Sequence, residues 1–292
     1  MNQKILDGWT YHDTETERLV EELKSWATDL DSDDTLPFLK LAIHTMGEHQ
    51  GQWQSLTELV ETMSHHDQTY RHAVLAVCHF MNGNALSAQS NELNYMKSGD
   101  SLLAYLEIKL LMVRGLVFSG KYQQALNLYE DIFAIVPADS GQSDFLRQVA
   151  IICNTLANEL MATPDRTESV KALMKASAHH SLMFWSQCGN WVNRERAFYL
   201  LSLVHLELGE DQKVVEFALE GLAVIEANGS EPIDEAFLQL VLGRAYLNKG
   251  LSSEFEQALE QADKLASQWQ DESLVSWYQE ERSRIQEDAV PA

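Results

Sequence analysis

Apolar residues recur three and four positions apart along most of the chain, which is the spacing of one face of an α-helix. The segments 195–208, ERAFYLLSLVHLEL, and 216–225, EFALEGLAVI, show this pattern. Strand signals are nearly absent, because no run of alternating β-branched residues is bounded by turns. Short breaks with glycine or proline separate the helix-length segments. The pattern therefore predicts an all-α protein in which helix, tight turn and helix repeat.

The breaks recur at a drifting period, with successive turn points 32, 37, 44, 45 and 41 residues apart. The turn points are Gly51, Gly83, Gly120, Pro164, Gly209 and Gly250. A period in this range is typical of a solenoid of helix pairs. Small residues recur seven positions before these points. We expect one of them, Gly243, to let two helices pack tightly, which offsets the cost of about 1 kcal/mol for a glycine inside a helix.

Two segments carry a resemblance to a known family. LGRAYLNKG, 242–250, is similar to the tetratricopeptide repeat (TPR) pattern L-G-x-x-Y-x-x-x-G, and GKYQQALNLYEDIFAIVP, 120–137, matches the second half of the same repeat. Most repeats are longer than the family's ~34 residues. They resemble the extended repeats of bacterial peptide-sensing and regulatory TPR proteins. The resemblance implies a TPR-like α-solenoid, a right-handed superhelix of antiparallel helix pairs.

The expected organisation is one continuous solenoid domain with caps at both ends. Residues 1–35 are predicted to form an N-terminal capping helix, and 36–99 to form degenerate helical repeats. Residues 100–265 carry the TPR-like repeats, and 266–292 form a C-terminal capping helix with a tail. Half-polar terminal helices of this kind keep a solenoid soluble.

The net negative charge of the chain limits the classes of molecule that it is expected to bind. It has 21 Lys and Arg against 44 Asp and Glu, a net charge of −23. Such a surface repels phosphate backbones and anionic membranes, so we expect no nucleic acid and no membrane as partner. The most apolar long stretch, 101–118, contains three charged residues, and the N-terminal segment has no signal-peptide core. These features favour a cytoplasmic protein with protein partners.

The sequence shows no catalytic, metal or cofactor motif. The densest histidine segment, SHHDQTYRH, contains the adjacent pair His65 and His66, and adjacent histidines seldom face one ion, so a solvated turn is favoured over a metal site. Three sparse cysteines favour reduced, structural thiols over disulfides or a zinc ribbon. The neighbouring aromatic residues Phe184, Trp185 and Trp191 fit either a core or a contact surface, and the core is favoured. We expect a non-enzymatic protein.

Candidate binding residues follow from the resemblance, because the first helix of each pair lines the concave groove in the TPR family. By that analogy the groove residues are Arg114, Phe118, Asn154, Asn158, Arg196, Tyr199, Arg244 and Asn248. Asparagine can both donate to and accept from a peptide backbone, and arginine suits carboxylates. The alternative is that the arginines only pair with neighbouring acidic residues.

The favoured function is a protein–protein or peptide-binding scaffold that uses this groove. One alternative is a regulatory sensor whose solenoid changes shape on binding a signalling peptide and acts through a partner protein. An enzyme on a helical scaffold is a third hypothesis. A fourth is self-association to a homo-oligomer through a terminal helix pair, which exposure of Trp277 or Trp269 would support.

Overall fold

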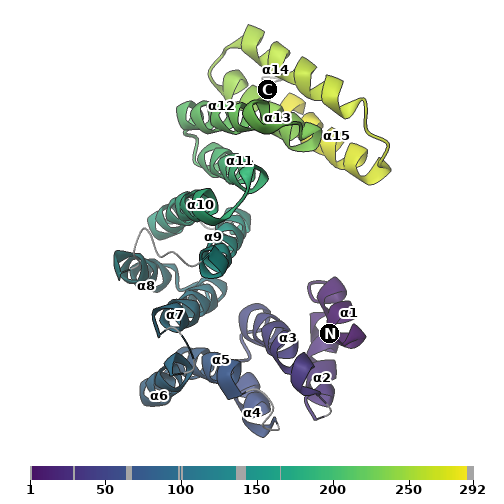
Figure 1. Cartoon of the computed structure of the whole chain (residues 1–292). Helices are drawn as coiled ribbons and strands as arrows, with labels where there is room; N and C mark the ends of the chain where they lie inside the picture. Colours follow the sequence, from purple (N-terminus) through teal and green to yellow (C-terminus); the bar gives the residue numbers. More distant parts are fainter. Residues whose placement is uncertain are drawn as a thin grey trace. The chain divides into compact units, whose positions relative to one another are not determined.

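The computed structural model contains only helices and no strand among the residues it describes. It divides into two compact units, unit 1 (Met1–Ala138) and unit 2 (Asp139–Ala292), shown in Figure 1. The described residues are 2–28, 30–63, 68–97, 99, 101–135, 143–164 and 166–287. The prediction of an all-α chain is confirmed. Of the described helices, none is both long enough and apolar enough to cross a membrane.

Unit 1 begins with three short helices that pack on one another and on a π-helix, η1. Further along the chain, α5 pairs with α6, and α7 pairs with α8. The elements are α1 (Gln3–Tyr11), α2 (Thr16–Trp26), α3 (Ser32–Ala42), η1 (Ile43–His49), α4 (Trp53–Thr62), α5 (Gln68–Met81), α6 (Ala85–Met96), α7 (Ser101–Phe118) and α8 (Tyr122–Ile135). The range 1–35, where one capping helix is predicted, thus contains α1, α2 and the start of α3.

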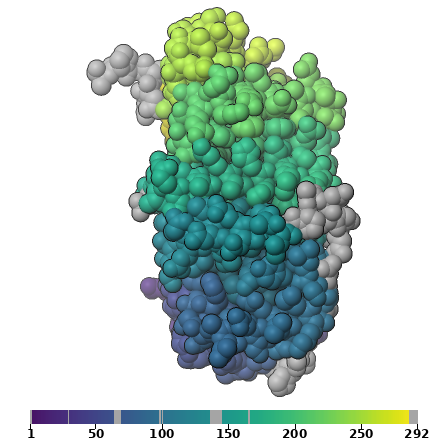
Figure 2. Space-filling view, turned by 90° about the vertical axis from the view of Figure 1, so that its left-hand side faces the viewer, coloured from purple at the N-terminus to yellow at the C-terminus, as the bar shows by residue number. Residues whose placement is uncertain are grey.

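Unit 2 consists of three helix hairpins and a terminal helix. In each hairpin the two consecutive helices pack against each other, and α15 packs on α13. The elements are α9 (Ser143–Ala162), α10 (Glu168–Cys188), α11 (Trp191–Glu207), α12 (Asp211–Asn228), α13 (Pro232–Asn248), α14 (Ser252–Ala266) and α15 (Glu272–Glu287). Within each unit the colours of Figure 2 change gradually, because segments that are close in sequence also lie close on the surface.

The turns between paired helices fall where the sequence predicts them. The five turn glycines have φ between 62° and 79°, in the left-handed region that side chains rarely adopt. They are Gly51, Gly83, Gly120, Gly209 and Gly250. At Gly250 the backbone N–H donates to the carbonyl of Leu247 at 2.9 Å, and the next N–H donates to the carbonyl of Tyr246 at 2.9 Å. This closed turn ends α13 and reverses the chain into α14.

The helix glycines differ in how much space surrounds them. A methyl group at Gly243 would lie 3.4 Å from Leu259, which is an ordinary contact distance. The α13–α14 approach is therefore close, but it does not require glycine as the sequence suggested. A much tighter place is in unit 1, where a methyl group at Gly47 would lie 2.4 Å from the Trp53 ring, and a methyl group at Gly115 would lie 3.2 Å from the same ring.

Of the three aromatic residues predicted to favour the core, two are buried on α10, and Trp191 on α11 is partly buried. Phe184 and Trp185 are buried. Cys78 and Cys153 are buried cysteines that form no disulfide. Burial raises the pKa of the half-buried Cys188 thiol. His65 and His66 lie outside the described residues.

Candidate functional site

A pocket of about 400 Å³ opens in unit 2 between α11, α13 and α15. Three of its lining residues, Tyr199, Arg244 and Asn248, are predicted groove residues. They come together because α11 and α13 are the first helices of successive hairpins and pack side by side. The other lining residues are Leu203, Leu206, Glu207, Phe237, Leu240, Val241, Glu281, Arg284 and Ile285.

The pocket has an apolar wall and a charged rim. Phe237 and Leu240 are buried in the wall. On the rim, the Asn248 amide donates to Asp211 at 2.8 Å. The Arg244 guanidinium lies 3.4 Å from the carbonyl oxygen of Arg284, which is a long contact for one of its five N–H donors.

The remaining predicted residues of unit 2 do not line this pocket. Arg196 donates to Asp234 at 2.9 Å and lies 3.6 Å from the fully buried Glu195. Burial, and then the neighbouring Asp234 carboxylate, raise the pKa of Glu195 to about 9, so this carboxyl is protonated at neutral pH. Asn158 bonds within α9 to Asn154, with 3.1 Å between their side chains.

In unit 1, Arg114 and Phe118 lie on α7 and face η1. The Arg114 guanidinium donates to the buried Glu48 carboxylate at 2.8 Å. The Phe118 ring lies 5.3 Å from the ring of His49. This pairing matches the alternative interpretation, in which the arginines only pair with neighbouring acidic residues. A role of Arg114 in ligand binding stays a prediction.

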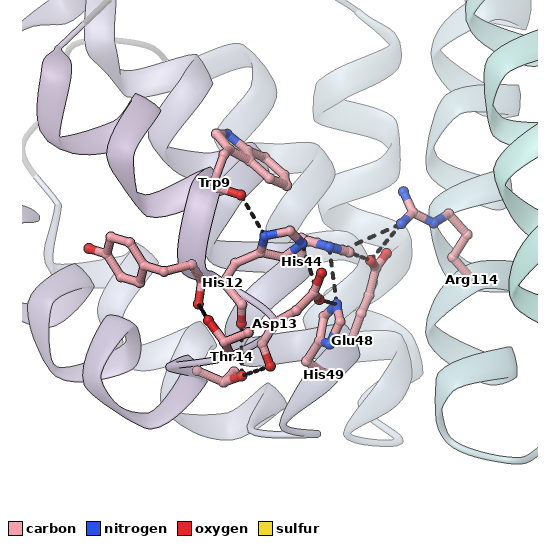
Figure 3. A network of polar contacts seen from close by, with 10 residues as sticks. Trp9, His12, Asp13, Thr14, His44, Glu48, His49 and Arg114 are labelled. Carbon is pink, nitrogen blue, oxygen red and sulfur yellow. Dashed lines mark hydrogen bonds and ion pairs between the residues drawn. The ribbon is translucent and has the colours of Figure 1, made fainter. Parts of the chain in front are cut away.

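The side chains that Arg114 and Phe118 face form a histidine cluster made of His12, His44 and His49 (Figure 3). The Nε2 atoms of His44 and His49 are 3.1 Å apart. Asp13 Oδ1 lies 3.2 Å from His12 Nε2 and 3.7 Å from His49 Nε2. Burial and the neighbouring His44 lower the pKa of His49, which favours its neutral imidazole.

No family model matches this sequence, and neither does any curated protein. Among solved structures, the chain is similar to BtubC (BKLC) from P. vanneervenii, with 15% identity, 89% of this chain and 95% of that chain covered, and a TM-score of 0.44. It is also similar to TPR-like repeats of a kinesin light chain from Podospora anserina, with 18% identity, coverage of 70% and 97%, and a TM-score of 0.44. The chain resembles TPR-like helical repeats. Because both scores are low, the assignment to helix hairpins rests on the chain's own turns and packing.

The sequence did not indicate the histidine cluster, and helix geometry explains why. In an α-helix of 3.6 residues per turn, His44 and His49 would point roughly 140° apart. The segment Ile43–His49 is instead a π-helix, whose hydrogen-bonded turn closes one residue later, so positions five apart share a face. The third histidine comes from the end of α1, more than 30 residues earlier. A repeat pattern in the sequence does not indicate that histidines from these two segments lie close together.

Proposed function

We propose that this chain is a helical-repeat scaffold that binds a segment of another protein through the pocket of unit 2. The observation that supports it most is that Tyr199, Arg244 and Asn248, chosen from expected groove-facing positions of two successive repeats, share one pocket. A volume of about 400 Å³ is within the range of binding pockets and admits one or two side chains. A preformed helical wall limits the ordering cost to the ligand.

The chemistry of the pocket suggests what the segment carries. The wall formed by Phe237, Leu240 and Val241 suits an apolar side chain. Arg244 at the rim suits a carboxylate, either a chain terminus or an acidic residue. Glu207 and Glu281 also lie on the rim, and their charge disfavours segments with several acidic residues in a row. We therefore expect an apolar residue next to a single carboxylate.

The test is selection of the purified chain against a random peptide library displayed with free C-termini. The selected peptides are then measured against Arg244→Ala and Arg194→Ala. Arg194 is an exposed arginine on α11 outside the pocket, so its variant removes the same charge at a control position. Loss of at least tenfold in affinity with Arg244→Ala alone supports the proposal. An enriched peptide family that binds Arg244→Ala as well as wild type contradicts it, and so does the absence of any enriched family.

The sensor alternative, the non-enzymatic character and homo-oligomer formation stay predictions. Trp277, which was considered for self-association, is half exposed and packs against Phe237 with ring centroids 4.3 Å apart.

A further inference from the structure

The three imidazoles of the histidine cluster and the Asp13 carboxylate come from two separate segments of unit 1 (Figure 3). His12 and Asp13 lie in the turn after α1, whereas His44 and His49 lie in η1. One ring nitrogen of each histidine lies within 4.8 Å of the others. Imidazole nitrogens together with a carboxylate oxygen are a donor set that zinc prefers.

Hydrogen bonds indicate which ring nitrogen can bind a metal in two of the three histidines, His12 and His44. His12 Nδ1 lies 2.8 Å from the carbonyl oxygen of Trp9, which can only accept, so this nitrogen carries the hydrogen. His44 Nδ1 lies 2.7 Å from the buried Glu48 carboxylate, and the same argument applies. In both rings the lone pair is then on Nε2, the atom that faces the cluster. Metal-binding histidines are held in this way, with the other N–H donated to a carbonyl or carboxylate.

The distances between these atoms approach those of a tetrahedral site. Zinc–nitrogen bonds of about 2.0–2.1 Å place two ligand atoms about 3.3 Å apart at tetrahedral angles. The Nε2 atoms of His44 and His49 are 3.1 Å apart. Asp13 Oδ1 lies 3.2 Å from the ring of His12 and 3.7 Å from that of His49.

The surroundings of the cluster also suit a cation. The Arg114 guanidinium, which lies 3.5 Å from His44 Nδ1, is compensated by the Glu48 carboxylate at 2.8 Å. The Trp9 ring stacks on His44 with centroids 5.3 Å apart, and Phe118 flanks His49. These rings limit the access of water to the nitrogens. The net charge of −23 raises the local concentration of cations around the whole chain.

We propose that the three histidines of the cluster and the neighbouring Asp13 bind a zinc ion, which ties the turn after α1 to η1. The ligands are His12, Asp13, His44 and His49. The site is independent of the peptide pocket, since every ligand belongs to unit 1. Its function is structural: one ion joins the first two helices to the helical repeat that follows.

The test is a zinc titration of the full chain after treatment with a chelator and dialysis. A chromogenic chelator competes for the metal, and the bound zinc per chain is determined from its absorbance. Wild type is expected to bind one zinc ion per chain and to melt at a higher temperature with zinc. His12→Gln and His49→Gln are each expected to bind zinc at least tenfold more weakly. The control is His72→Gln, since His72 is a unit 1 histidine bonded to Asn91 outside the cluster.

A second measurement needs no variant. Wild type is treated with diethyl pyrocarbonate with and without zinc, and the modified histidines are identified by mass spectrometry. Zinc is expected to protect His12 and His49 but not His72. Three outcomes overturn the proposal: wild type binds less than one zinc ion, zinc gives His12 and His49 no protection, or both cluster variants bind zinc as wild type does.

Discussion

The contact between Gly47 and Trp53 leads to a specific prediction about stability. A methyl group added at Gly47 would lie 2.4 Å from Cζ3 of the Trp53 ring. The ring cannot move away freely, because it is only 6% exposed and Gly115 lies against another side of it. Overpacking of a tight core costs about 1–3 kcal/mol, and this contact belongs at the upper end of that range.

The expected magnitude for Gly47→Ala follows from two opposing effects. Replacing glycine by alanine inside a helix gains about 1 kcal/mol, and the clash costs about 3 kcal/mol, so the variant should lose about 2 kcal/mol. For a unit of this size the melting temperature should fall by roughly 5–8 °C. The matched substitution Gly243→Ala, where the methyl group has room, should gain up to about 1 kcal/mol.

The assay is urea unfolding followed by far-UV circular dichroism for each variant against wild type. A double-mutant cycle with Trp53→Leu isolates the contact, since leucine removes the ring atoms that meet the methyl group. The double variant should be more stable than the sum of the single effects predicts, by about 1–3 kcal/mol. If Gly47→Ala unfolds like wild type, or if the two effects simply add, the argument from this contact is wrong.

Two further predictions concern buried ionisable side chains. Arg114→Ala should destabilise unit 1 by about 3–5 kcal/mol in urea unfolding, because Glu48 is 3% exposed and loses its cation. The double variant Arg114→Ala with Glu48→Gln should recover much of this loss. Equal losses in the single and the double variant would contradict a charge effect. The pKa of Glu195 is raised to about 9 from a usual value near 4.5, so the folded chain holds a proton that the unfolded chain releases. Stability should therefore fall as pH rises between these values, by up to about 1.4 kcal/mol per pH unit, and Glu195→Gln should flatten the profile measured between about pH 7 and 8.5; parallel profiles would refute it.

Much of the fold was predictable from the sequence because it depends on local rules. Helical periodicity and the scarcity of strand signals determine the all-α class. The turn glycines were predictable one by one, since a left-handed φ favours glycine and the sequence therefore has a glycine at most of the turns. The expected groove-facing positions of the first helices also indicated that Tyr199, Arg244 and Asn248 would share a surface, because stacked hairpins place their first helices side by side.

Only the tertiary structure decided the rest. Gly243 and Gly47 look alike as helix glycines, yet only Gly47 meets a ring, because the space around a helix depends on side chains distant in sequence. Arg114 and Arg244 occupy the same repeat position, but one pairs with buried Glu48 while the other lines a pocket. The histidine cluster depends on a π-helix and on a turn from another segment. The repeat period and the residue spacing in the sequence describe the backbone, which repeats. The glycine contact, the two arginine environments and the histidine cluster depend on side-chain contacts that do not repeat.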